Sequence, residues 1–226
     1  MNKLADYSAI IFDMDGLVLD TEATYSVAWQ EAALDMGQVF TDNFCLSMSG
    51  LQGQDVARKL KEHCGADFDL ARFGQLSGKY WRQNVNQKGI AVKKGFSALL
   101  NILKSNNIPY CLATNSAKAN ALECLKLANL DGVFSIVVSK DQVKRGKPAA
   151  DIFLYAAELL KQPVSHCLVI EDSSTGIQAA INAAAPNVFI PSVLPYDADT
   201  ARQADVLLND LDELAEIVLS AYIHPV

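Results

Sequence analysis

Residues 10–22 read Ile-Ile-Phe-Asp-Met-Asp-Gly-Leu-Val-Leu-Asp-Thr-Glu, and this stretch decides the fold. An apolar run ends in two acids, Asp13 and Asp15, which Gly16 follows directly. Such a run is typical of a buried strand, and open α/β sheets bind ligands at the carboxyl ends of their strands. Because unpaired buried charge is costly, packing does not explain two acids there. The pattern indicates a bound cation, or an acid that attacks a substrate beside one that handles a proton. The alternative is a solvated turn.

The rest of the chain alternates short apolar runs with helical patterns. The first strand is expected at Ala9–Phe12, and apolar positions at helical spacing predict helices between the later strands. Strand–helix alternation predicts an α/β fold with a doubly wound, parallel, Rossmann-like sheet. The further strands, the last of them an edge strand, are expected at 110–113, 136–138, 167–170, 188–190 and 206–208.

One region breaks this alternation. Residues 21–88 show helical patterns without a convincing strand, and the last of these helices, from about Leu70 to Val85, is weakened by Gly74 and Gly78. We therefore expect an all-α domain inserted directly after the first strand. The predicted division is a Rossmann-like core formed by residues 1–19 and 90–226, with the inserted helical domain at 20–89. The two adjoining linkers, Leu17–Asp20 and Lys88–Gly95, have the geometry of a hinge.

Composition narrows the function classes. The chain has 226 residues, half of them apolar, and a net charge of −7, which argues against nucleic-acid binding. No apolar stretch reaches transmembrane length, and the N-terminus lacks a signal-peptide pattern, so no membrane partner is expected. The five cysteines are dispersed, and Cys111 and Cys167 lie in apolar runs as core residues. We expect a cytoplasmic protein; its oligomeric state is undetermined, with a monomer favoured.

Polar residues follow the second predicted strand. Thr114, Asn115 and Ser116 come at its end, just before a helical pattern. Hydroxyls and free backbone N–H groups at a helix start suit an anion such as phosphate, which makes Thr114 and Asn115 candidates for phosphate binding. The alternative is a helix N-cap, for which Thr, Asn and Ser are the usual residues. Both roles can coexist.

A cluster of cations precedes another helical pattern. Pro148 is expected in the first turn of the following helix, and it biases Lys147 toward an extended conformation. Lys147 would then be held at a helix entrance rather than on a mobile surface. The alternative is a solvated surface patch, because Lys144 and Arg145 are close in sequence.

Two adjacent acids end the fourth predicted strand. Glu171 and Asp172 repeat the anomaly of the first strand, but neighbouring strand residues point to opposite faces. Asp172 is therefore the better candidate metal ligand, while Glu171 binds the metal through water or orients the site. The alternative is a helix N-cap region in which the helix dipole favours acids.

In combination, these motifs make the chain resemble the haloacid dehalogenase (HAD) superfamily of phosphotransferases. The similarity covers nearly the whole length and is closest to the subgroup with a small α-helical cap, which includes β-phosphoglucomutase and many sugar-phosphate phosphatases. The motifs that carry it are Phe-Asp-Met-Asp-Gly at 12–16, Ala-Thr-Asn at 113–115, Gly-Lys-Pro-x-x-Asp-Ile-Phe at 146–153 and Glu-Asp at 171–172.

The resemblance implies a role for each motif. Asp13 would attack phosphorus to form an aspartyl-phosphate, and Asp15 would serve as general acid and then base. Mg²⁺ would be held by Asp13, the backbone carbonyl of Asp15, Asp172 and waters. Lys147 and the Thr114 hydroxyl would stabilise the transferring phosphoryl group. The implied activity is a Mg²⁺-dependent phosphatase acting on a small soluble phosphate monoester, a sugar phosphate or a similar phosphorylated metabolite.

Two alternatives stay open. A phosphomutase like β-phosphoglucomutase is disfavoured, because Tyr25 stands where those enzymes carry a histidine and Gly53 where they carry an arginine. A non-catalytic phosphate-sensing or regulatory protein on the same fold is disfavoured because every reactive side chain is present. Substrate contacts are expected from the inserted domain, at Glu22, Gly50 and Gln52.

Overall fold

The computed structural model describes residues 7–49, 51 and 53–223. The chain divides into two compact units. One, here called the core unit, runs up to Leu19 and resumes at Val92; the other, the helical unit, is Asp20–Ala91. Within the described ranges, no helix combines the length and the apolar character needed to cross a bilayer.

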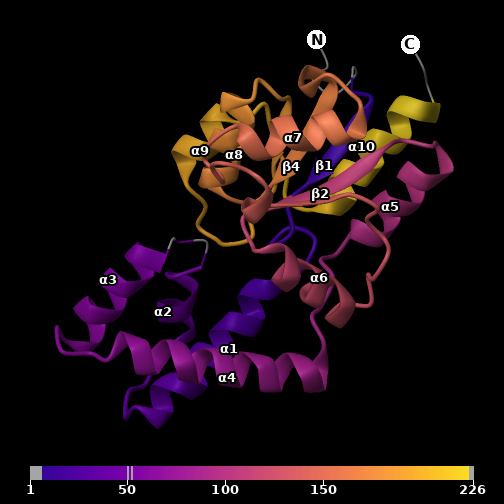
Figure 1. The fold of residues 1–226 in the computed structure, drawn as a ribbon. Helices are drawn as coiled ribbons and strands as arrows, with labels where there is room; N and C mark the ends of the chain where they lie inside the picture. Colours follow the sequence, from indigo (N-terminus) through magenta and orange to yellow (C-terminus); the bar gives the residue numbers. More distant parts are fainter. Residues whose placement is uncertain (1–6, 50, 52, 224–226) are drawn as a thin grey trace. The chain divides into compact units, whose positions relative to one another are not determined.

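The core unit is built on a six-stranded sheet in which every neighbouring pair is parallel. The strand order β3-β2-β1-β4-β5-β6 places β1 in the middle, as Figure 1 shows. The predicted fold class is confirmed, and all six predicted strands are present with ends shifted by one residue at most. The strands are β1 (Ala9–Phe12), β2 (Tyr110–Thr114), β3 (Val137–Ser139), β4 (Cys167–Glu171), β5 (Asn187–Phe189) and β6 (Val206–Leu207).

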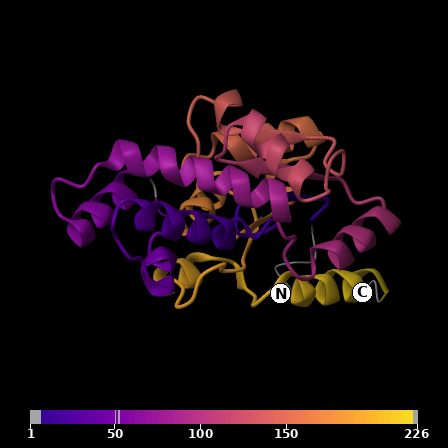
Figure 2. The same cartoon turned by 90° about the horizontal axis from the view of Figure 1, so that it is seen from below.

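Helices cover both faces of this sheet. Side chains along β1 alternate between the two faces, so neighbouring residues contact different helices. Ile11 lies in a cluster with Ile152 and Ala179 from α7 and α8. Phe12 points to the other face and meets Phe96 of α5 edge-on at a ring-centroid distance of 5.6 Å. On that face α5 and α10 lie side by side (Figures 1 and 2). The helices are α5 (Phe96–Ser105), α6 (Lys118–Leu127), α7 (Asp151–Leu160), α8 (Ser174–Asn182), α9 (Ala198–Gln203) and α10 (Leu211–Ile223).

The helical unit contains α1 (Thr21–Asp35), α2 (Asp42–Leu46), α3 (Gly53–Cys64) and α4 (Leu70–Lys88). Its described residues form no strand, as predicted. A small apolar core includes Phe40, Met48 and Phe73. The short helix α2 has no counterpart in the sequence prediction, since five residues are too few to show a helical period.

The chain passes between the units through two paired segments. Leu19 forms an antiparallel bridge with Val92. The Lys93 N–H donates to the Val18 carbonyl at 2.9 Å, and the Asp20 N–H donates to the Ala91 carbonyl at 2.8 Å. The predicted linkers are thus tied to each other, and their action as a hinge stays a prediction.

The five cysteines all lie within the described residues and are free of disulfides. Cys111 and Cys167 are fully buried, which confirms their prediction as core residues. Burial raises the pKa of the Cys167 thiol to about 11, so it stays protonated near neutral pH. These thiols therefore act as small apolar side chains.

Candidate active site

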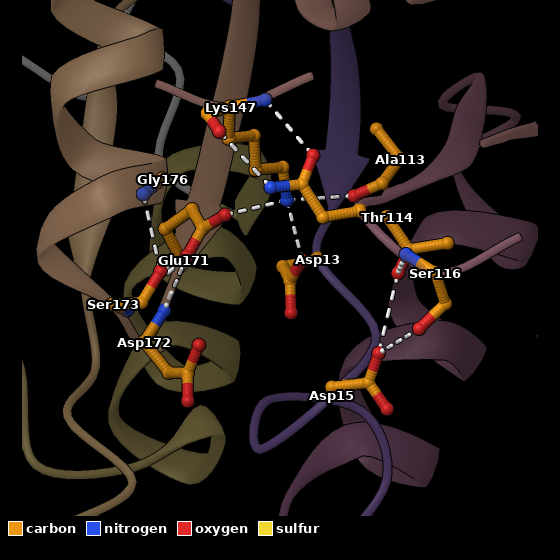
Figure 3. Close-up of polar contacts among 11 residues, drawn as sticks. Asp13, Asp15, Ala113, Thr114, Ser116, Lys147, Glu171, Asp172, Ser173 and Gly176 are labelled. Carbon is orange, nitrogen blue, oxygen red and sulfur yellow. Dashed lines mark hydrogen bonds and ion pairs between the residues drawn. The ribbon is translucent and has the colours of Figure 1, made fainter. Parts of the chain in front are cut away.

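The order of the central strands brings the predicted site residues together. Because β1 lies between β2 and β4 and all three are parallel, their carboxyl ends meet at one edge of the sheet. Asp13 directly follows β1, Thr114 is the last residue of β2, and Glu171 is the last residue of β4. Figure 3 shows these side chains with Lys147 and Asp15 in a single cluster.

Lys147 is the centre of this cluster. It is 6% exposed, and its Nζ donates to Asp13 Oδ1 at 2.5 Å, Glu171 Oε1 at 2.6 Å and the Ala113 carbonyl at 2.8 Å. An ammonium group has three donors, so all of them are used. The surface-patch interpretation is therefore wrong for this residue: Lys147 is a buried cation between two carboxylates.

The local backbone differs from the prediction. Helix α7 begins at Asp151, so Pro148 lies in the turn before the helix and not in its first turn. The peptide bond between Lys147 and Pro148 is cis. A turn closed by the hydrogen bond from the Ala149 N–H to the Gly146 carbonyl takes up these residues, and this delays the helix start.

Asn115 holds the Lys147 backbone on both sides. Its Oδ1 accepts from the Lys147 N–H at 2.8 Å, and its Nδ2 donates to the Lys147 carbonyl at 3.1 Å. A Cβ on Gly146 would lie 2.5 Å from Asn115 Oδ1, so glycine is needed for this approach. The N-cap of α6 is Ala117, without a side-chain cap, so the capping interpretation is wrong for the polar residues before it. The Asn115 side chain is thus occupied with Lys147, and phosphate binding by this residue stays a prediction.

Glu171 is held as tightly as Lys147. Its Oε2 accepts from the Asp172 N–H at 3.0 Å, the Ser173 N–H at 3.2 Å and the Ser173 hydroxyl at 2.9 Å, while Oε1 accepts from Lys147. The carboxylate lies against the first turn of α8, where a Cβ on Gly176 would come within 1.8 Å of it. The N-cap of α8 is Ser173, so neither acid is the capping residue.

The buried charges are mutually dependent. Burial raises the pKa of Asp13 well above its ordinary value, although the charge of Lys147 opposes this shift and that of Glu171 adds to it. Burial by itself lowers the pKa of Lys147, but the two carboxylates beside it raise it by more, so its pKa lies above the ordinary value. Lys147 therefore stays protonated near neutral pH. For Asp13, burial is the largest cause of the shift.

Asp15 is held from the side of β2. Its Oδ2 accepts from the Thr114 hydroxyl at 3.2 Å and from the Ser116 hydroxyl at 2.9 Å (Figure 3). The turn that follows needs a glycine, because Gly16 has φ +84° and a Cβ there would lie 2.1 Å from Asp172 Oδ2. Ser116 belongs to the polar run after β2 and is a site residue that the motifs do not predict. The available signal was that its hydroxyl lies in the same polar run as Thr114, directly after β2.

Three carboxylates could hold a metal ion. Asp13, Glu171 and Asp172 each offer an oxygen, and these oxygens all lie within 4.8 Å of one another. Oxygen donors of this kind fit a hard divalent cation. Both oxygens of Glu171 already accept hydrogen bonds, whereas Figure 3 shows the Asp13 carboxylate lying between Asp172 on one side and Asp15 on the other. The donor set therefore fits an ion between Asp13 and Asp172.

Three further predicted substrate contacts fall within the range of the helical unit. Glu22 is in the first turn of α1 in the helical unit and is partly exposed. Gly50 and Gln52 lie outside the described residues. A substrate role for these three residues stays a prediction.

A doubly wound parallel sheet with an Asp-x-Asp pair after its first strand, a buried lysine and a carboxylate cluster defines a hydrolase of the haloacid dehalogenase type. The model of the haloacid dehalogenase-like hydrolase family matches residues 10–190. The chain belongs to this family.

Relatives add detail. The chain is 34% identical over 212 residues to a Drosophila melanogaster protein provisionally named as a pseudouridine-5'-phosphatase, covering 89% of each chain. It is 30% identical over 181 residues to a phosphorylated carbohydrates phosphatase from Thermotoga maritima, covering 80% of this chain and 83% of the relative. A crystal structure of a Thermotoga maritima protein, provisionally assigned as a β-phosphoglucomutase, superposes with a TM-score of 0.80 at 27% identity, over 94% of this chain and 99% of that one.

Proposed function

We propose that this protein is a Mg²⁺-dependent phosphatase that hydrolyses a small soluble phosphate monoester through an aspartyl-phosphate on Asp13. The observation that carries the proposal is the pair formed by Asp13 and Lys147 beside two further acids, with Asp15 two residues away. A nucleophilic carboxylate, a cation for the phosphoryl group and an acid for the leaving oxygen are the parts that such a reaction needs.

The first step transfers the phosphoryl group. An oxygen of Asp13 attacks phosphorus, the bond between phosphorus and the ester oxygen breaks, and Asp15 gives a proton to the departing oxygen. Lys147 is fixed by three acceptors, so its charge needs no rearrangement to stabilise the phosphoryl oxygens. The Thr114 hydroxyl is assigned to the same oxygens. In the second step water attacks phosphorus, the bond between phosphorus and the Asp13 oxygen breaks, and inorganic phosphate leaves. Asp15 takes the proton from this water, which reverses its role.

The ion is assigned to the carboxylates of Asp13 and Asp172 and to the backbone carbonyl of Asp15. When bound, Mg²⁺ supplies positive charge that lets an anionic carboxylate approach an anionic phosphate. Glu171 is assigned to Lys147 and the loop at the start of α8 rather than to direct ligation, because both of its oxygens already accept hydrogen bonds.

A sugar phosphate or a similar phosphorylated metabolite is the proposed substrate class. The names of relatives support it: one is a phosphorylated carbohydrates phosphatase and another a fructose-1-phosphate phosphatase from Escherichia coli, 31% identical over 176 residues. A ribose-linked phosphate falls in the same class, as the name of the Drosophila relative suggests. In all of these the leaving group is a sugar alkoxide, a poor leaving group that needs an acid such as Asp15.

The phosphomutase alternative makes a different product. The likeness to the Thermotoga structure supports this alternative. Tyr25, however, is stacked on Trp29 and on Trp81, with ring-centroid distances of 6.1 and 5.7 Å. An aromatic ring in that stack supplies no counterpart to a histidine that shuttles protons. We therefore favour hydrolysis.

The test is a panel of phosphorylated metabolites incubated with the purified protein, with Mg²⁺ or with a chelator. We expect release of inorganic phosphate from a subset of sugar phosphates in the presence of Mg²⁺, and none from the chelated protein. The Asp13→Asn variant is the matched control for contaminating phosphatases. Conversion of a monophosphate to its isomer without free phosphate would establish the mutase instead, and inactivity on the whole panel would contradict the proposal.

A further inference from the structure

Ser116 is the one hydroxyl in the close-up of the site that contacts Asp15 and has no role in the proposed reaction (Figure 3). It lies just beyond β2, before α6, and is half-buried. Its hydroxyl donates to Asp15 Oδ2 at 2.9 Å. We propose that Ser116 is a positioning residue that fixes the Asp15 carboxyl group in the orientation needed for proton exchange with the leaving oxygen and the attacking water. This inference rests on the proposed function and deepens it.

Thr114 contacts the same oxygen, but its position differs. Its hydroxyl donates to Asp15 Oδ2 at 3.2 Å, and its oxygen accepts from the Ser116 N–H at 3.0 Å. A hydroxyl has one proton to donate. In the proposed reaction that proton goes to a phosphoryl oxygen, so Thr114 gives up Asp15 when the substrate binds. Ser116 then remains as the hydroxyl of the pair that holds the acid.

The backbone around Ser116 is anchored, which makes it suitable for this task. The preceding residue, Asn115, is bonded to both the N–H and the carbonyl of Lys147. The Ser116 N–H is itself bonded to Thr114. One short segment after β2 therefore holds the buried cation on one side and the acid on the other. This single segment therefore fixes the position of Lys147 relative to Asp15.

The experiment measures how the Ser116→Ala variant responds to the leaving group. An acid matters most when the leaving oxygen is poor. For a sugar phosphate accepted by the wild type, kcat/KM should fall about 10- to 100-fold, as expected when a hydrogen bond to a charged group is lost. For 4-nitrophenyl phosphate it should fall less than about threefold, because a nitrophenolate needs little protonation. Ser116→Thr, which restores the hydroxyl, should recover most of the loss.

A double-mutant cycle separates positioning from direct substrate contact. Single-turnover cleavage of the sugar phosphate, the ester on which Ser116→Ala loses most, is measured for Asp15→Asn with and without Ser116→Ala. If Ser116 acts through Asp15, the second substitution changes the rate by less than about twofold in this background. Ser220→Ala, at an exposed serine of α10, is the matched control and should leave both esters unaffected.

Several outcomes overturn the inference. Equal losses with both esters, a loss that persists in the Asp15→Asn background, or no loss with the sugar phosphate would each remove the positioning role. If the alanine variant does not fold, as judged by its unfolding midpoint, Ser116→Cys gives the same test with a weak donor of similar size. A wild-type protein that releases no phosphate overturns the proposed function and this inference with it. An active wild type with an unaffected variant overturns only the inference.

Discussion

The core unit and the helical unit use polar side chains in opposite ways. In the core unit Asp13, Lys147 and Glu171 are buried, and each has a charged or hydrogen-bonding partner. In the described part of the helical unit, Thr21 is the single buried polar residue and no charged side chain is buried. The interior of that unit is aromatic and aliphatic instead. We therefore propose that the core unit carries the chemistry and that substrate preference depends on the helical unit.

The strongest test of this division is Asp13→Asn. The variant should lose phosphatase activity by on the order of 10⁴-fold or more, as expected when a nucleophile is removed. Its unfolding temperature should equal or exceed that of the wild type, because a neutral amide replaces an acid whose pKa burial raises. Steady-state kinetics and thermal unfolding measure the two effects. A variant that keeps full velocity would show that Asp13 is not the nucleophile.

The next test compares one residue from each unit. Asp15→Asn removes the proposed acid and base and should lower turnover by about 10²- to 10⁴-fold. Gln52→Ala, in the helical unit, should change turnover far less, because no proton transfer depends on it. Turnover of both variants is measured with the best substrate of the panel. Equal losses would contradict the role assigned to Asp15 and the division between the units.

Two glycines offer a comparison in stability. Gly176→Ala in the core unit places a Cβ 1.8 Å from the Glu171 carboxylate, so the variant should lose about 1–3 kcal/mol of unfolding free energy. Gly74→Ala in α4 of the helical unit meets nothing within 4 Å and should gain about 0.5–1 kcal/mol through helix propensity. Urea unfolding followed by circular dichroism measures both. A neutral Gly176→Ala would show that the Glu171 carboxylate can move away from α8, which would contradict the tight placement described for it.

Much of the core unit could be predicted because the signals are local. Each apolar run marks a strand, and each strand ends where its polar residues begin, so the motifs identify the sheet edge that carries the site. The hydrogen-bond partners of the site residues could not be predicted in the same way. Asn115 and Lys147 are 32 residues apart, and no periodicity connects an amide with a distant backbone. The burial of Lys147 also depends on three separate segments, so its neighbours in sequence, Lys144 and Arg145, suggested a surface instead.

The boundaries of the helices follow the same principle. Ser173 caps α8 through a local bond to the Gly176 N–H, a pattern that spacing can reveal. The start of α7 at Asp151 depends on the turn at Gly146, which the Asn115 contact requires. Long-range packing therefore overrides the preference of Pro148 for a first helical turn.

The smallest expected effect concerns Tyr25, in α1 of the helical unit. Its ring is stacked at 27° on Trp29 and at 14° on Trp81, and such aromatic pairs contribute about 0.5–1.5 kcal/mol each. Tyr25→Ala removes both ring contacts. If the helical unit sets the substrate preference, as proposed, the ratio of kcat/KM between two sugar phosphates should change by about 3- to 10-fold. Tyr25→Phe, which keeps the stack, should change it by less than about twofold. Release of 4-nitrophenolate should persist in both variants because the buried charges of the core unit are untouched. A loss with Tyr25→Ala as large as that with Asp15→Asn would mean that the helical unit takes part in the chemistry itself.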